Sequence, residues 1–110
     1  MQKPLQKINL KQLGYRIIGG KGDGYDLVVE REGETLYIEV KGRKHFEDVE
    51  LREKQARKAL DEKEKYCILV VYNIPNNPEA YILRNPAEKG EITATILLKA
   101  SLIQADCVIT

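Results

Sequence analysis

Apolar residues recur at every second position along residues 25–29 and again along residues 36–40, with Glu32 and Gly33 between the two runs. This period of two is typical of β-strands that have one buried face. A two-residue turn between such strands needs positive φ angles, which glycine adopts readily. The pattern therefore predicts a β-hairpin with Glu32 and Gly33 at its tip.

The register of this hairpin determines which side chains are neighbours across the two strands. Counting outward from the turn, where Arg31 lies opposite Glu34, places Asp26 opposite Glu39. Lys41 then projects on the same face as Glu39, because side chains alternate along a strand. The apolar residues of both strands are expected on the other face: Tyr25, Leu27, Val29, Leu36, Ile38 and Val40.

Other elements follow from helical spacing and from short apolar runs. These patterns predict helices over Pro4–Leu13 and Asp48–Glu64, and strands over Tyr15–Ile18, Tyr66–Ile74 and Ala80–Leu83. The last segment, Glu91–Thr110, leaves strand and helix open. Its first residues favour a strand because several are β-branched, whereas Leu97–Ile103 also fits a helix.

The order of these elements indicates the fold class. A strand, a helix and another strand after the hairpin imply a crossover between parallel strands, with the helix packed on the sheet. We therefore expect an α/β fold with a mixed central β-sheet and flanking helices. The chain has 110 residues, 43% of them hydrophobic, which is enough for one modest core. A single domain over residues 1–110 is expected.

Composition excludes some kinds of site and is silent on partners. The formal net charge is only +1, so any basic surface must be local. Cys67 and Cys107 are the only cysteines, and there is one histidine, which disfavours a disulfide framework and a structural zinc site. The sequence has no signal-peptide pattern and no apolar run of about 18 residues. We expect a cytoplasmic protein that does not span a membrane.

The predicted hairpin brings two carboxylates together. Opposed side chains on paired strands lie about 5 Å apart, and like charges there are destabilising. A divalent cation bound by Asp26 and Glu39 would neutralise the pair, and Mg²⁺ takes one or two carboxylates together with water or phosphate oxygens. Lys41, beside such a site, is suited to orienting a water or stabilising charge on a phosphate. The alternative is that Glu39 and Lys41 are solvated charges on an exposed sheet face.

Asp26 followed by Glu39-Val40-Lys41 resembles the motif of the PD-(D/E)XK nuclease superfamily. The surrounding residues, 24–27 and 38–42, are similar to its Mrr-like branch. The sequence most resembles the C-terminal domain family of Protein NO VEIN and its prokaryotic relatives, which occur in restriction and helicase-associated proteins. Further similar positions follow downstream, and the resemblance covers roughly residues 24–86: Leu51, Gln55, Ala59, Tyr66, Val70, Val71, Tyr72, Asn73, Asn85 and Pro86.

This resemblance implies a restriction-endonuclease-like fold and metal-dependent hydrolysis of DNA. Asp26 and Glu39 would bind Mg²⁺ or Mn²⁺, and Lys41 would complete the catalytic set. The expected contacts to nucleic acid are Lys41, Arg43, Lys44 and Gln55. A homodimer, or association with larger restriction or helicase subunits, is the expected assembly.

The sequence departs from the superfamily pattern in one respect. Many of these nucleases carry an acid on an opening helix, whereas here no Asp or Glu precedes Asp23. Either that ligand is missing, or Asp23 replaces it, or the chain is part of a longer protein. A non-catalytic nucleic-acid-binding or assembly module with the same fold therefore stays open, as does a plain interaction domain. His45 in the basic loop is best explained as a surface residue.

Overall fold

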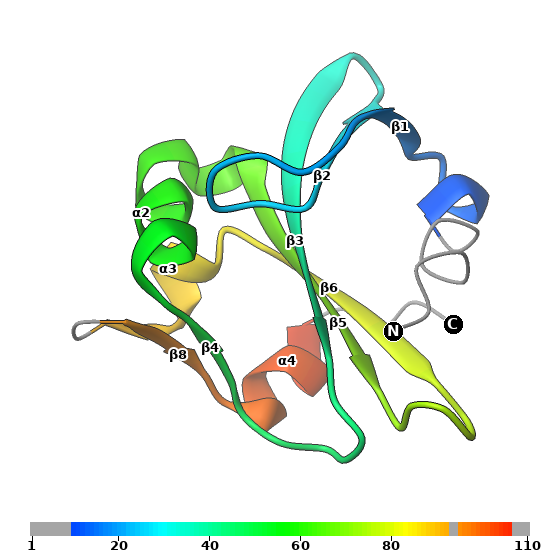
Figure 1. Cartoon of the computed structure of the whole chain (residues 1–110), viewed down its shortest axis with the longest axis vertical. Helices are drawn as coiled ribbons and strands as arrows, with labels where there is room; N and C mark the ends of the chain where they lie inside the picture. The colour runs from blue at the N-terminus through cyan, green and yellow to red at the C-terminus, as the bar shows by residue number, and fades with distance from the viewer. Residues whose placement is uncertain (1–9, 93–94, 107–110) are drawn as a thin grey trace.

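The computed structural model describes residues 10–92 and 95–106. Their main element is a five-stranded β-sheet with the strand order β1-β2-β3-β5-β6 (Figure 1). Strands β3 and β5 are parallel, and the other neighbouring pairs are antiparallel, so the predicted mixed sheet is confirmed. The strands are β1 (Arg16–Gly19), β2 (Leu27–Arg31), β3 (Glu34–Gly42), β5 (Tyr66–Tyr72) and β6 (Glu79–Arg84).

The turn between β2 and β3 fixes their register. Glu32 and Gly33 have φ angles of 53° and 79°, as a two-residue hairpin turn with two positive φ angles requires. The paired residues include Arg31 with Glu34, Val28 with Tyr37 and Leu27 with Ile38. This is the predicted register over residues 27–31 and 34–38. Asp26 directly precedes the paired residues, and its backbone N–H donates to the carbonyl of Ile38.

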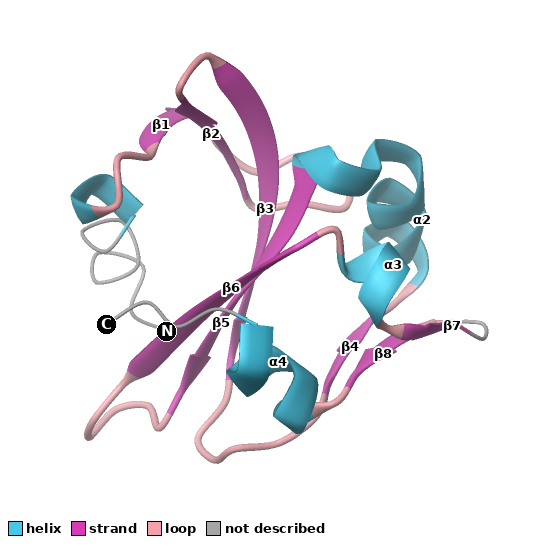
Figure 2. Cartoon of the chain, turned by 180° about the vertical axis from the view of Figure 1, so that it is seen from behind, coloured by secondary structure: helices cyan, strands magenta, loops and turns pink. Residues whose placement is uncertain are grey.

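Helices and a second, small sheet cover one face of the main sheet (Figure 2). The helices are α2 (Glu53–Glu62), the 3₁₀ helix η1 (Lys63–Lys65), α3 (Pro86–Lys89) and α4 (Ala100–Asp106). The small sheet has the order β4-β8-β7, with β4 (Val49–Leu51), β8 (Ile96–Leu98) and β7 (Glu91–Ile92). None of the described helices is long and apolar enough to cross a membrane.

Strand β5 lies at the centre of the molecule, and all seven of its residues are buried. Other parts of the chain cover both faces of β5. Its sequence is therefore continuously apolar rather than alternating. Tyr66, Ile68, Val70 and Tyr72 pack under the helices and the small sheet. Cys67, Leu69 and Val71 pack on the opposite face with residues of β2 and β3 and with Leu10.

Two local predictions are corrected by the structure. The predicted helix over Asp48–Glu64 begins only at Glu53, because Val49–Leu51 forms β4 and pairs with β8, far along the chain. Tyr25 does not share a face with Leu27. It precedes β2 and packs on the helix side, with its ring 5.0 Å from that of Tyr37.

The chain ends are described in part. Residues 10–12 are helical, and the rest of the predicted helix over Pro4–Leu13 falls largely on residues 4–9, which lie outside the described residues. The strand predicted over Tyr15–Ile18 is β1, shifted by one residue. The segment Glu91–Thr110 contains both element types that its sequence left open, strands β7 and β8 followed by helix α4.

Gly24 sets how closely the loop before β2 approaches α2, and this generates a stability prediction. Its φ is +89°, and an added Cβ would lie 2.4 Å from the backbone oxygen of Lys54. Gly24→Ala therefore combines backbone strain with overpacking, and we expect it to lower the free energy of unfolding by about 2 kcal/mol or more. Gly20→Ala is the matched control, because nothing lies within 4 Å of its added Cβ.

Urea unfolding of the two variants and the wild type measures this difference. Gly20→Ala should stay within about 0.5 kcal/mol of the wild type. Equal losses in the two variants would contradict the close approach of α2 to Gly24.

Candidate active site

A pocket of about 330 Å³ opens between the loop before β2, strand β3 and the first turn of α2. Its lining consists of residues 21–26, Glu39, Lys54 and Gln55. The two arms of the hairpin thus bring Asp26 and Glu39 to one concave surface, and α2 adds Lys54 and Gln55. Concave sites with a few convergent polar groups are where ligands usually bind in proteins.

Asp26 lies at the end of the β2–β3 ladder. Its backbone N–H donates to the carbonyl of Ile38 at 2.8 Å, and its Oδ2 accepts from the N–H of Val40 at 2.9 Å. Strand β2 begins only at Leu27, so the side chain of Asp26 supplies the acceptor that Val40 lacks there. These two hydrogen bonds fix the half-buried carboxylate against β3 and into the pocket.

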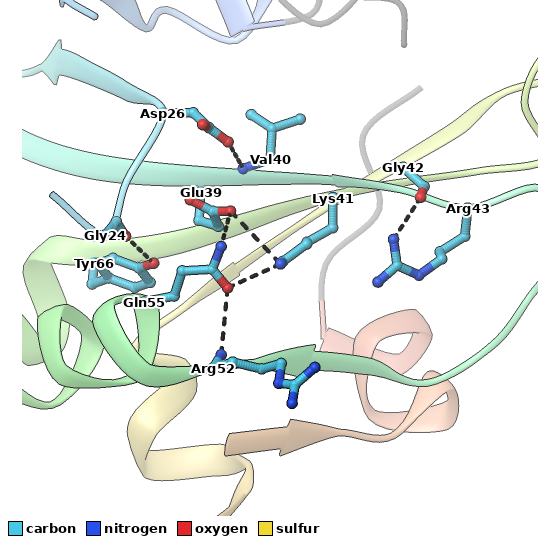
Figure 3. A network of polar contacts seen from close by, with 10 residues as sticks. All are labelled: Gly24, Asp26, Glu39, Val40, Lys41, Gly42, Arg43, Arg52, Gln55 and Tyr66. Atoms are coloured by element: carbon cyan, nitrogen blue, oxygen red, sulfur yellow. Dashed lines mark hydrogen bonds and ion pairs between the residues drawn. The ribbon is translucent and has the colours of Figure 1, made fainter. Parts of the chain in front are cut away.

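Glu39 is the only charged residue among the described ones that is fully buried, with 5% of its surface exposed. Its Oε2 accepts a hydrogen bond of 2.7 Å from Nε2 of Gln55 and lies 3.8 Å from Nζ of Lys41 (Figure 3). Nζ of Lys41 in turn donates to Oε1 of Gln55 at 2.9 Å. The three side chains therefore form a closed polar triangle between β3 and α2.

The position of Gln55 explains why this triangle forms. It is the third residue of α2, and its Oε1 also lies 3.4 Å from the backbone N of Arg52, just before the helix. An amide has one acceptor end and one donor end. Only the orientation seen here gives the donor to the Glu39 carboxylate and the acceptor to the Lys41 ammonium. Removing one partner of a buried ion pair typically costs about 3–5 kcal/mol.

Tyr66 supports the pocket from below. Its hydroxyl donates to the carbonyl of Gly24 at 2.7 Å, and the side chain is fully buried. Burial raises the pKa of this hydroxyl well above its usual value, and the negative charges of Glu39 and Asp26 raise it further. Tyr66 therefore stays protonated at all ordinary pH values and holds the Gly24 loop in place.

The structure separates the predicted nucleic-acid contacts into two groups. Lys41 and Gln55 contact Glu39, as described above. Arg43 and Lys44 lie beyond the end of β3, beside other pockets, and the Arg43 guanidinium donates to the carbonyl of Gly42. Figure 3 shows the Arg43 side chain folded back onto the carbonyl of Gly42, without a drawn contact to the triangle. His45 is exposed in the same loop, in agreement with its interpretation as a surface residue.

Two basic residues of the pocket were missed by the sequence reasoning. Lys21 and Lys54 both line it, and Nζ of Lys54 lies 3.5 Å from Oδ1 of Asp23. The only sequence signal for Lys54 as a pocket residue is that it directly precedes Gln55 on α2. Asp23, the proposed substitute for the missing early acid, does line the pocket, but its carboxylate is exposed and pairs with Lys54.

The donor set fits a hard divalent cation that keeps part of its water. Asp26 and Glu39 give two carboxylates on one pocket, and Mg²⁺ usually takes one or two carboxylates with water or phosphate oxygens. Within residues 10–92 and 95–106 no group of three or more Asp, Glu, His or Cys side chains is placed to hold a metal ion. A cation here would therefore complete its shell with solvent or substrate oxygens.

Comparison with solved structures gives the fold. The chain is similar to Hjc, a Holliday junction resolvase from the archaeal hyperthermophile Archaeoglobus fulgidus, with a TM-score of 0.63. The two sequences are 16% identical, and the match covers 93% of this chain and 91% of that one. The likeness confirms the expected restriction-endonuclease-like fold. No curated protein sequence matches the chain significantly.

Comparison with protein families gives the family. The family profile described as Protein NO VEIN, C-terminal matches residues 9–83. These residues include the β2–β3 hairpin, helix α2 and strand β5. The match spans more than half of the chain and contains the residues on which the sequence resemblance was based, except Asn85 and Pro86. This chain belongs to the Protein NO VEIN C-terminal family and has the fold of the PD-(D/E)XK nucleases.

Proposed function

We propose that this domain is a metal-dependent nuclease that hydrolyses phosphodiester bonds of DNA, with Asp26, Glu39 and Lys41 as its catalytic residues. The observation that carries the proposal is the buried Glu39 carboxylate, which contacts Lys41 and Gln55 and lines the same pocket as Asp26. A buried charge with a specific charge partner in a pocket is characteristic of functional sites. The fold shared with a Holliday junction resolvase supports the same reaction class.

Each residue of the site has a distinct role in this proposal. Asp26 and Glu39 hold Mg²⁺ or Mn²⁺, an ion that supplies charge neutralisation and a more acidic bound water. Gln55 holds the ammonium of Lys41 through its Oε1. Lys41 is 18% exposed at its side chain, so it keeps access to the solvent side while its charge is fixed. Held in this way, Lys41 orients the attacking water and stabilises negative charge on the phosphate.

The proposal extends to partners and biological setting. DNA is the substrate, and restriction or repair is the setting that fits a nuclease of this fold. Assembly as a homodimer, or with larger restriction or helicase subunits, and a cytoplasmic location belong to the same proposal. The support for DNA as substrate is that the structural relative is a Holliday junction resolvase.

A second candidate function is a non-catalytic nucleic-acid-binding or assembly module. One observation favours it: the Glu39 carboxylate is already compensated by the Lys41 ammonium and the Gln55 amide. A buried charge that is paired and hydrogen-bonded is stable without a further ion. Metal-dependent cleavage of plasmid DNA distinguishes the two candidates, because only the nuclease cleaves.

The first prediction from this site concerns metal binding. Asp26→Asn should weaken Mn²⁺ binding at least about tenfold, because a neutral amide replaces a charged ligand. Asparagine keeps an acceptor oxygen for the N–H of Val40, so the fold should be retained. Isothermal titration calorimetry measures the affinity, with Asp61→Asn as the matched control on an exposed position of α2. Equal affinity of the Asp26 variant and wild type would remove Asp26 from the metal site.

The second prediction concerns Lys41. Lys41→Ala should lower the cleavage rate at saturating DNA by about a hundredfold or more, since it removes a charge directed at the reacting phosphate. Lys65→Ala, an exposed lysine of η1, should cleave at the wild-type rate. Because Lys41 also pairs with buried Glu39, thermal unfolding should accompany the assay. A folded Lys41→Ala variant that cleaves normally would exclude Lys41 from the mechanism.

The third prediction uses the triangle itself. Gln55→Glu places a second carboxylate beside Glu39, so the variant should unfold at a lower temperature than wild type in EDTA. Added Mn²⁺ should raise its melting temperature more than that of wild type, because a metal bound only to the folded state stabilises it by mass action. Thermal unfolding with and without Mn²⁺ tests this. An equal Mn²⁺ response in both proteins would argue against a cation at Glu39.

A further inference from the structure

Two loops meet where the parallel strands β3 and β5 end. The backbone N–H of Arg43 donates to the carbonyl of Val71 at 2.9 Å, and that of Ile74 donates to the carbonyl of Arg43 at 3.4 Å. Figure 1 shows these loops side by side at the lower end of the sheet. Two pockets, of about 430 and 290 Å³, lie between them and share Lys44 and Ile74. We call residues 43–46 and 73–77 the loop surface.

The loop surface is locally basic. Lys44 and His45 are exposed, and neither forms an ion pair with a described residue. Arg43 pairs with Glu47 at 3.6 Å. The larger pocket adds the amide side chains of residues 73, 76 and 77. Cations without a partner and amide groups are the residue types that contact phosphates and base edges of nucleic acids.

Phe46 gives the loop surface an aromatic platform. It is 47% exposed, although it is a large apolar side chain. Its ring centroid lies 5.1 Å from that of Tyr72, in an edge-to-face arrangement. Tyr72 is fully buried, packs on Tyr81, and donates from its hydroxyl to the carbonyl of Glu47 at 2.7 Å. Phe46 is therefore held from beneath by a fixed aromatic residue while nearly half of its surface faces solvent.

We propose that the loop surface binds a single-stranded segment of the DNA substrate, with an unpaired base stacked on Phe46 and a phosphate on Lys44. The inference rests on the proposed function, since it extends the substrate path from the Asp26 and Glu39 pocket. An aromatic ring can stack only on a base whose face is not covered by its neighbours, as in a single strand. Strand β3 joins the two sites directly. The five residue steps from Glu39 to Lys44 span at most about 17 Å, which is the length of roughly five nucleotides in a stacked strand, at about 3.4 Å each.

Fluorescence anisotropy with a labelled single-stranded oligonucleotide and a matching duplex, both in EDTA, tests this. Without a divalent metal no cleavage intervenes, and binding does not depend on the carboxylates. Phe46→Ala should weaken single-strand binding about tenfold, because stacking on one base is lost. Its effect on duplex binding should stay below about twofold, and the salt dependence should not change. Leu60→Ala is the matched control, since Leu60 is 44% exposed on α2, and it should bind as wild type.

Two further variants separate stacking from packing and from charge. Phe46→Leu keeps the apolar contact with Tyr72 but not the aromatic face, and should lose affinity, whereas Phe46→Trp should retain it. Lys44→Ala should weaken the binding of both the single strand and the duplex. It should also lower the magnitude of the slope of log K against log salt by about 0.7 for the single strand. Circular dichroism should show all variants folded.

Several results would overturn the inference. These are an unchanged single-strand affinity of Phe46→Ala, equal losses on single strand and duplex, or no DNA binding by the wild type. Plasmid cleavage tests the proposed function separately. If the wild type cleaves plasmid DNA and Phe46→Ala keeps its single-strand affinity, only the inference about the loop surface is refuted. If Phe46→Ala loses single-strand affinity but the wild type cleaves no DNA, only the nuclease proposal is refuted.

Discussion

The buried charge of Glu39 is the constraint on which the rest of the site depends. A carboxylate that is 5% exposed loses its hydration, and it is tolerated only with close compensation. Lys41 and Gln55 provide that compensation. Strand β3 must therefore present residues 39 and 41 on the same face, and α2 must begin where its third residue reaches them. Gly24 completes the arrangement, because a side chain there would push α2 away.

The architecture meets this constraint by covering both faces of β5 and its neighbour β3. One face lies under the helices and the small sheet, and it contains both the polar triangle and the larger aromatic residues of the core. On the other face, the described buried residues are all apolar. A polar site can exist inside the first layer because each of its groups has a partner there.

Strand β3 connects two chemically different surfaces. Around Glu39 two carboxylates, Asp26 and Glu39, line one pocket, which suits a cation. Beyond Gly42 the side chains of Lys44, His45 and Phe46 are exposed, two of them basic and one aromatic. The sequence reasoning treated Lys41, Arg43 and Lys44 as one set of nucleic-acid contacts, whereas the structure divides them between these surfaces. A strand that carries both surfaces fixes their spacing, because an extended backbone has a constant rise per residue.

The sequence by itself determined the hairpin, its register and the mixed sheet. Those features depend on side-chain alternation and on the glycine turn, which are local and leave a direct pattern in the residues. Tertiary structure alone decided that Val49–Leu51 is a strand, because its partner β8 lies far along the chain and no local pattern records that pairing. It also decided that Gln55 bridges Glu39 and Lys41 and that Lys21 and Lys54 line the pocket. These contacts depend on how α2 docks on the sheet, which is set by packing between distant segments rather than by the order of neighbouring residues.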